Sequence, residues 1–269
     1  INKYNIEHPQ VCYVPSVDPI KTCDTCIVEV DGQLVRSCST KAVDGMNIQL
    51  DSPNAKGAQT EAMDRLLENH MLYCTVCDNN NGNCTLHNTT EMMGIEHQKY
   101  PFSPKEEPEN AVDSSHPFYR YDANQCIACG QCVEVCQNLQ VNETLSLDWE
   151  AERPRVIWDE GVDINDSSCV SCGQCVTVCP CNALMEKSML GEAGFMTSIK
   201  QDTSEPMIDL IKEVEPGYSG IFAISEIEAA MRSKRTKKTK TVCTFCGVGC
   251  SFEVWTKGRK ILKVQPSEG

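Results

Sequence analysis

The chain has 269 residues, of which 19 are cysteine, and a formal net charge of -14 from 24 basic and 38 acidic side chains. This charge argues against a general nucleic-acid binder, whose affinity would come from neutralising phosphates. The sequence contains no signal peptide and no apolar run of about 18 residues or more, so neither export nor a membrane span is expected, and a reducing cytoplasm is predicted.

All but one of the cysteines fall into five ordered groups, and the exception is Cys181. Neighbouring cysteines at C-x2-C spacing are far commoner as metal or redox ligands than in disulfide frameworks, which argues against a secreted disulfide scaffold. Because the groups are spread along the whole length, we expect several small modules held together by their metal sites. The predicted fold class is α+β, a multi-module iron-sulfur protein.

The first group is Cys12, Cys23, Cys26 and Cys38, with spacing C-x10-C-x2-C-x11-C. Around it, residues 27–30 and 33–36 predict a hairpin whose turn is Asp31-Gly32. Four thiolates from one compact loop and its flanking strands suit a 2Fe-2S cluster, and the same four atoms would also suit a tetrahedral zinc ion. The spacing of this group alone leaves both open.

The second group is H-x3-C-x2-C-x6-C, made of His70, Cys74, Cys77 and Cys84. Before it, Met63, Leu66, Leu67 and Met71 recur at helical spacing and predict a helix over 60–71 with Thr60 as N-cap. A histidine four residues before a C-x2-C pair is interpreted as a ligand, so the group predicts a 4Fe-4S site with one His and three Cys ligands. His87 is interpreted as an ordinary polar residue.

Two runs of C-x2-C-x2-C-x3-C carry the third and fourth groups, separated by 32 residues. In such runs the fourth cysteine ligates the other cluster, so ligation should cross over. The predicted 4Fe-4S ligands are Cys126, Cys129, Cys132 and Cys179 for one cluster, and Cys169, Cys172, Cys175 and Cys136 for the other. Between the runs, residues 155–158 predict a strand and 165–168 a turn. Cys181, two residues beyond Cys179, is interpreted as a packed free thiol.

The segments between the groups are interpreted as connectors. Residues 100–122, with four prolines, predict an extended linker, and residues 204–215 and 225–232 predict helices. The basic run from Arg232 to Lys240 is interpreted as a solvated linker, with contact to cofactor phosphates as the alternative.

The last group, Cys243, Cys246 and Cys250 in T-V-C-T-F-C-G-V-G-C-S, supplies three thiolates where a closed 4Fe-4S site needs four. Residues 252–255 and 261–264, joined across Lys257-Gly258, predict a hairpin after it. We expect the fourth ligand to lie beyond the chain, and the eleven residues before Cys12 suggest that the chain begins inside its first module.

In order and spacing, these groups resemble the modules of cytosolic molybdenum or tungsten bis-pterin formate dehydrogenase catalytic subunits. Complex I large subunits share the first two sites but lack the paired runs, and iron-only hydrogenases share the first four sites but continue with another cysteine pattern. The resemblance implies a partial β-grasp 2Fe-2S domain over 1–53, a 4Fe-4S domain with one His and three Cys ligands over 54–99, and a two-cluster ferredoxin domain over 100–200. A helical and basic linker over 201–240 and the start of a molybdopterin domain over 241–269 would follow.

What the resemblance implies for function is the electron-relay part of a formate dehydrogenase, an oxidoreductase that turns formate into carbon dioxide. The implied cofactors are one 2Fe-2S cluster, three complete 4Fe-4S clusters, a fourth lacking its last ligand here, and, in the full-length protein only, a Mo or W bis-molybdopterin guanine dinucleotide. Electrons would pass from the Cys243 group through the paired cubanes, the His70 cluster and the 2Fe-2S centre to an acceptor or small accessory subunit, in a protein that could be an oligomer. No catalytic residue is expected among these positions. The alternatives are the electron-transfer region of an iron-only hydrogenase, a stand-alone electron carrier and a zinc-binding structural protein.

Overall fold

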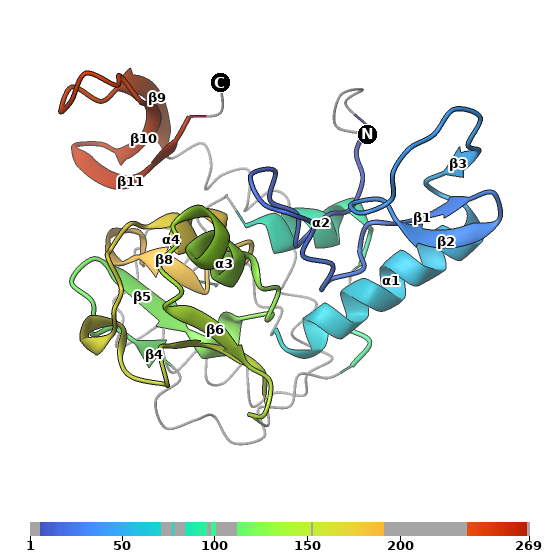
Figure 1. Ribbon diagram of the computed structural model, residues 1–269, viewed down its shortest axis with the longest axis horizontal. Coiled ribbons are helices and arrows are strands. Elements are labelled where there is room, and N and C mark those ends of the chain that lie inside the picture. Colours follow the sequence, from blue (N-terminus) through green and yellow to red (C-terminus); the bar gives the residue numbers. More distant parts are fainter. Residues whose placement is uncertain are drawn as a thin grey trace.

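The structure is a computed structural model that describes residues 6–70, 77, 84–95, 98–100, 112–151, 153–190 and 236–267. This part of the chain contains both helices and strands, and the strands form four small sheets. Figure 1 shows the first sheet with helix α1 on one side of the molecule, the ferredoxin-like elements on the other, and the last sheet beyond them. The α+β composition expected from the sequence is therefore observed.

The first sheet has the order β2-β1-β3, with β1 (Ile27–Val30), β2 (Gln33–Arg36) and β3 (Ile48–Gln49) all antiparallel. The predicted hairpin is confirmed. Its turn residues Asp31 and Gly32 have φ of 49° and 82°, the two positive values that a type I′ turn requires. The hairpin turn thereby sets the register that pairs Ile27 with Arg36.

Helix α1 (Pro53–Glu68) lies along this sheet and is longer at its start than predicted. Thr60 is not its N-cap: the cap is Ser52, whose hydroxyl accepts a hydrogen bond from the Ala55 N–H over 3.1 Å, and proline occupies the first helical position. Met63 and Leu67 are buried as expected, and the helix ends two residues before His70. Ser-Pro is itself a helix-start signal, and it outweighed the later threonine.

Helix α2 (Thr85–Met92) begins directly after Cys84, whose sulfur accepts from the His87 N–H over 3.4 Å. The next sheet has the order β4-β5-β8, with β4 (Val112–Asp113), β5 (Tyr119–Asp122) and β8 (Leu184–Glu186). The interpretation of 100–122 as a linker is thus wrong at its end, where two strands form. Residues 101–111 lie outside the described part.

Between β5 and β8 lie the two cysteine runs. The short helices of this region are η2 (Ala123–Gln125), α3 (Gln131–Glu134), the π-helical η3 (Val135–Leu139), η4 (Ile164–Asp166) and α4 (Gln174–Val178). A further short helix, η5 (Lys187–Met189), follows β8. Strand β7 (Arg155–Trp158) is where it was predicted and pairs with β6 (Leu145–Asp148). The predicted turn at 165–168 overlaps η4.

The last sheet has the order β11-β10-β9, formed by β9 (Lys237–Val242), β10 (Ser251–Lys257) and β11 (Lys260–Pro266). The predicted hairpin over 252–264 is confirmed, with Gly258 at φ 58° in its turn. The described part of the basic run is a strand rather than a linker, and Lys238 Nζ lies 3.8 Å from the centre of the Trp255 ring. The two helices predicted over 204–232 lie outside the described residues.

One apolar cluster joins the first three modules and includes both aliphatic side chains and cysteines. Its buried members run from Val11 through Met63, Leu86, Tyr121, Val135 and Trp158 to Leu184. A separate small cluster of Met185, Met189 and Leu262 connects the last sheet to η5. The modules therefore share a core, although each alone buries little apolar surface.

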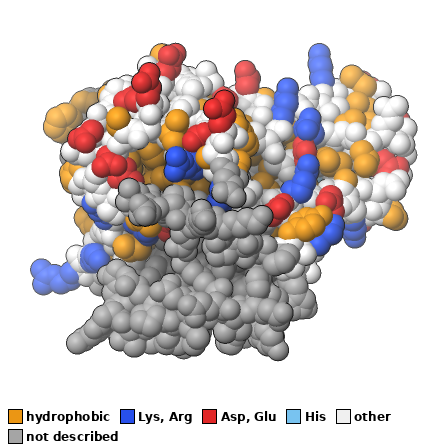
Figure 2. Space-filling view, turned by 90° about the horizontal axis from the view of Figure 1, so that it is seen from below, with side chains coloured by type: hydrophobic (Ala, Val, Ile, Leu, Met, Phe, Trp, Pro, Cys, Tyr) orange, Lys and Arg blue, Asp and Glu red, His pale blue; other side chains and the backbone are white. Residues whose placement is uncertain are grey.

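On the face drawn in Figure 2, acidic and basic side chains lie among one another wherever the side chains are described, without a continuous basic band. None of the described helices is both long and apolar enough to cross a bilayer.

Candidate metal centres

The first cysteine group gathers around the loop that precedes β1. Cys12, Cys23 and Cys26 are buried, and Cys38 is partly exposed. A hydrogen bond from Cys23 lowers the pKa of Cys12, while burial and then the Cys26 contact raise the pKa of Cys38 to about 11. The four predicted ligands thus lie in two contacting pairs, Cys12 with Cys23 and Cys26 with Cys38.

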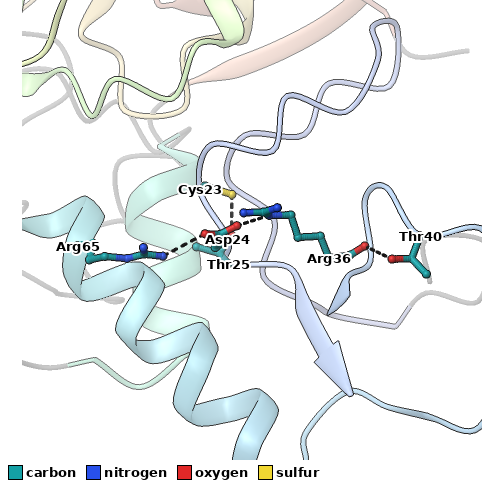
Figure 3. A network of polar contacts seen from close by, with 6 residues as sticks. All are labelled: Cys23, Asp24, Thr25, Arg36, Thr40 and Arg65. Carbon is teal, nitrogen blue, oxygen red and sulfur yellow. Dashed lines mark hydrogen bonds and ion pairs between the residues drawn. The ribbon is translucent and has the colours of Figure 1, made fainter. Parts of the chain in front are cut away.

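Polar contacts hold this loop in place (Figure 3). Asp24, between two predicted ligands, has a positive φ of 58° and accepts from Arg36 of β2 and, over 3.2 Å, from Arg65 of α1. The Arg36 guanidinium holds the pKa of the Asp24 carboxyl below its usual value. These bonds tie the ligand loop both to its own sheet and to α1, a role that the sequence did not indicate.

Thr25 contacts a predicted ligand directly. Its side chain is fully buried, and its hydroxyl oxygen lies 3.2 Å from Cys23 Sγ and accepts from the Val11 N–H over 3.2 Å. Since a metal-bound thiolate can only accept, the Thr25 hydroxyl would donate to the sulfur. Hydrogen bonds to ligand sulfurs are among the factors that set a cluster's potential.

His70 is buried just past the end of α1. Its Nδ1 lies 3.1 Å from the backbone oxygen of Gln125, and because a carbonyl only accepts, Nδ1 carries the proton and donates. The Nε2 lone pair is then the one suited to a metal. Burial lowers the pKa of His70 to about 4, so the imidazole is neutral.

Two side chains hold the end of α1 where His70 lies. Gln98 Nε2 donates to the carbonyls of Leu67 and His70 over 2.7 and 2.6 Å, and Arg153 donates to the carbonyls of Asn69 and Asn124. Neither was indicated by the sequence, because both contacts join residues far apart along the chain.

Two of the other predicted ligands of the second group are described. Cys77 and Cys84 are buried, and burial, with smaller contributions from the charges of Cys77 and Cys179, raises the pKa of the Cys84 thiol to about 12. The Cys84 sulfur donates to the Pro180 carbonyl over 3.6 Å. Cys74 lies outside the described residues. His87 is a buried polar residue, in agreement with its interpretation.

The two ferredoxin-like runs adopt the same local backbone. In each, the residue before the second cysteine has a positive φ, 51° at Ala128 and 57° at Ser171, and the N–H of that residue donates to the sulfur of the first cysteine. In each, a glycine with positive φ precedes a short helix, Gly130 before α3 and Gly173 before α4. Equal spacing in the sequence has produced equal loops.

Two cavities lie between these loops, and each is bordered by cysteines from both runs. One is lined by Cys126, Cys129, Cys132 and Cys179, together with Cys181. The other is lined by Cys136, Cys169, Cys172 and Cys175. These are the two crossed sets that the spacing predicts, and the structure brings each set together around one space.

The two cavities differ in exposure. The cysteines of the first run are buried, and burial raises the pKa of Cys129 and Cys132 well above the ordinary thiol value. At the second cavity Cys172 is exposed, and the loop is held by His116, whose Nε2 lies 2.8 Å from Ser171 Oγ. The second site is therefore the one nearer solvent.

Cys181 is buried and lines the first cavity without being one of its predicted ligands. Its sulfur donates to the Gln125 carbonyl over 3.0 Å and lies 4.0 Å from Cys179 Sγ. The Gln125 carbonyl thus accepts from both His70 and Cys181. The packed thiol predicted for Cys181 is observed, and its hydrogen bond to the Gln125 carbonyl was not predicted from the sequence.

The fifth group lies in the loop between β9 and β10, where the Cys243 N–H donates to the Cys250 carbonyl over 2.8 Å. Cys246 and Cys250 are exposed, as is the Phe245 side chain. Within the described part of the chain, no three His, Cys, Asp or Glu side chains converge closely enough to hold a single metal ion. The sulfurs of the third and fourth groups instead border spaces.

Four families match successive parts of the chain. Residues 1–53 match the 2Fe-2S iron-sulfur cluster binding domain, and residues 59–99 match the NADH-ubiquinone oxidoreductase-G iron-sulfur binding region. Residues 97–183 match the 4Fe-4S dicluster domain, and residues 236–268 match the molybdopterin oxidoreductase Fe4S4 domain.

The chain is similar to several longer bacterial proteins. It is 81% identical to "Putative formate dehydrogenase YrhE" of Bacillus subtilis over 99% of its own length and 27% of that protein. It is 62% identical to "Probable oxidoreductase YjgC" of the same organism, again over 27% of that protein, and 60% identical to Staphylococcus aureus proteins named putative formate dehydrogenase, over 26% of their length. The chain thus spans about a quarter of the length of these relatives.

A solved structure shares the fold. A chain of the NAD+-reducing [NiFe]-hydrogenase in its H2-reduced state superposes with a TM-score of 0.62 at 23% identity, covering 85% of this chain and 89% of that one. At this identity the likeness concerns the arrangement of the modules.

Proposed function

We propose that this chain, a homologue of the iron-sulfur region of proteins named as formate dehydrogenases, relays single electrons from a formate-oxidising centre to an acceptor subunit. The observation that carries the proposal is the pair of cavities, each bordered by four cysteines in the crossed sets. Clusters bound at such sites would supply one-electron chemistry, which amino-acid side chains at neutral pH do not.

The residues present fit such clusters. We assign Cys12, Cys23, Cys26 and Cys38 to a 2Fe-2S cluster, and the crossed sets, together with the group of His70, Cys74, Cys77 and Cys84, to three 4Fe-4S clusters. The first cavity is lined mainly by buried apolar side chains and cysteines, and thiolates that border a space suit a cluster better than a single zinc ion, which draws its sulfurs to about 2.3 Å. Cys243, Cys246 and Cys250 would contribute three ligands to a fifth site.

The arrangement favours a branched order of sites over the linear order expected from the sequence. The loop that carries Cys126 and Cys129 makes two contacts with other proposed sites. The Gln125 carbonyl accepts a hydrogen bond from His70, and the Cys129 carbonyl accepts one from Thr22 of the proposed 2Fe-2S loop. Both neighbours are therefore hydrogen-bonded to the backbone at or next to cysteines that line the first cavity. We propose that the first cavity is the point from which electrons can leave by either site.

For the whole protein, we propose oxidation of formate to carbon dioxide, a proton and two electrons at a molybdenum or tungsten bis-pterin centre. The supports are the similarity of 236–268 to the molybdopterin oxidoreductase Fe4S4 domain and the names of the relatives. An acceptor or accessory subunit would collect the electrons in the cytoplasm. The module limits proposed from the sequence, 1–53, 54–99, 100–200, 201–240 and 241–269, are retained as a working division.

The test uses the full protein that carries this sequence, purified without oxygen. Formate should bleach the visible absorption of the clusters and produce their reduced electron paramagnetic resonance (EPR) signals. In a Cys243→Ser variant, formate should no longer reduce the clusters quickly, while dithionite still should. Cys181→Ser, outside the assigned ligands, is the matched control. Equally fast reduction by formate in the Cys243 variant would contradict the relay.

A further inference from the structure

Two ligand loops from different modules are joined by a reciprocal pair of hydrogen bonds. Thr22, next to Cys23 in the 2Fe-2S loop, donates its hydroxyl proton to the carbonyl of Cys129 over 2.6 Å. Gln131, next to Cys132 in the first ferredoxin-like loop, donates from Nε2 to the carbonyl of Val11, next to Cys12. In each loop, therefore, a side chain next to a predicted ligand donates to a backbone carbonyl of the other loop, at or next to one of that loop's predicted ligands.

The contact between these loops is close, and its Gln131 half is buried, whereas Thr22 lies at an exposed edge. Val11 is fully buried, and Gln131 and Cys129 are 5% and 7% exposed. A Cβ on Gly130 would lie 3.3 Å from Ile20 Cγ2, so the Ile20 side chain packs closely against the Gly130 backbone. Because Val11 is fully buried, losing the Gln131 donor would leave its carbonyl without that hydrogen bond.

We propose that Thr22 and Gln131 are positioning residues that hold the 2Fe-2S loop and the first cavity's ligand loop at electron-transfer contact. Clusters held by Cys126, Cys129, Cys132 and Cys179 and by Cys12, Cys23, Cys26 and Cys38 would exchange one electron across this contact, the first being oxidised and the second reduced. No bond forms or breaks and no proton moves. The inference rests on the proposed relay function and adds which of the chain's own groups make the junction.

A purely structural role is the competing explanation, and the chain offers matched residues to separate the two. Gln59 is another buried glutamine, and its Nε2 donates to the carbonyls of Ile27 and Leu50 over 2.7 and 3.0 Å within one module. Thr90 is a fully buried threonine whose hydroxyl donates to the Leu86 carbonyl over 2.7 Å within α2. Both make the same kinds of bond away from the junction.

The experiment compares Thr22→Val and Gln131→Met with Thr90→Val and Gln59→Met in the cluster-loaded protein. Electrons are supplied by rapid photoreduction, and the rate at which the EPR signal of the reduced 2Fe-2S cluster appears is measured. Midpoint potentials are measured for both sites, so that each rate is corrected for its driving force. The magnetic interaction between the two reduced sites, seen as faster spin relaxation of the 2Fe-2S signal, reports their separation independently of activity.

We expect the two junction variants to keep both EPR signals and to lose part of the magnetic interaction. The corrected transfer rate should fall severalfold, and the double variant should be slower than either single one. The control variants should match the wild type in both respects. Equal slowing in the controls, or unchanged rate and interaction in the junction variants, would overturn the inference. Absence of both signals from the wild-type protein would instead refute the proposed function.

Discussion

The imidazole of His70 donates a hydrogen bond from Nδ1 to the backbone carbonyl of Gln125, the residue that precedes Cys126. This bond fixes the tautomer and leaves Nε2 as the nitrogen available to a metal. It also joins two proposed ligands of different clusters by one hydrogen bond and a short stretch of backbone. His70, a proposed ligand of the second site, therefore also contacts the backbone next to the first ferredoxin-like run.

Replacing His70 by cysteine should lower the midpoint potential of the second site. A thiolate adds a negative charge where a neutral imidazole stood, and this favours the oxidised cluster, as the comparison of Rieske centres with ferredoxins indicates. An EPR-monitored redox titration measures the change. His116→Asn, at another buried histidine that contacts Ser171, should leave this potential where it was. An unchanged potential in His70→Cys would rule out His70 as a ligand.

Thr25→Val should lower the midpoint potential of the 2Fe-2S site. The substitution keeps the shape of the side chain and removes the hydroxyl that lies 3.2 Å from Cys23 Sγ, so the thiolate loses a donor that stabilises the reduced, more negative state. Thr25→Ser retains the hydroxyl and is the matched control. If valine and serine give the same potential, the hydroxyl does not donate to the sulfur.

Gly173→Ala should weaken the second cavity's site. Gly173 has φ of 74°, and an added Cβ would lie 2.8 Å from the Tyr119 hydroxyl oxygen, so the substitution adds a clash to about 1–2 kcal/mol of left-handed strain. Iron content and denaturant unfolding should both fall, and Tyr119→Phe in the same chain should restore part of the loss.

Gly57→Ala is the control for that variant. Gly57 lies inside α1 with open space around its Cα, so alanine there should stabilise by about 0.5–1 kcal/mol. Should both alanine variants unfold at the same denaturant concentration, neither strain nor the contact with Tyr119 would matter at Gly173.

Asp24→Asn should destabilise the 2Fe-2S loop modestly, by about 1 kcal/mol in all, because it removes two partly exposed ion pairs worth about 0.5 kcal/mol each. Asparagine tolerates the positive φ of 58°, so the change isolates the charge, whereas Asp24→Ala should cost more. Urea unfolding at low and high salt measures both. A difference from wild type that does not shrink in high salt would exclude the ion pairs as its source.

The sequence predicted local and spacing-encoded features well. Equal C-x2-C-x2-C-x3-C runs gave equal loops around Ala128 and Ser171, and alternation around Asp31-Gly32 gave the first hairpin. Pairings over long separations were missed. Strand β5 was assigned to a linker, because its partner β8 lies more than sixty residues later, and α2 is too short for a clear helical pattern.

The sequence also predicted the ligand sets better than the contacts that join one ligand set to the next. Spacing is enough to propose which cysteines share a cluster, since ligands within a run are fixed by a few dihedral angles. Contacts such as Thr22 with Cys129, or His70 with Gln125, depend on how modules pack, and the sequence around Thr22 and Gln125 does not indicate them. These contacts support the proposed branched order of sites, and the linear order expected from the sequence stays a prediction.

The most direct test of the account is analysis of iron, zinc and acid-labile sulfide in the anaerobically purified chain, with its visible spectrum. We predict a brown protein with iron and sulfide in about equal amounts and little zinc, since 2Fe-2S and 4Fe-4S clusters contain the two elements equally. A colourless protein that contains zinc and no sulfide would contradict the assignment of every site, and with it the electron relay.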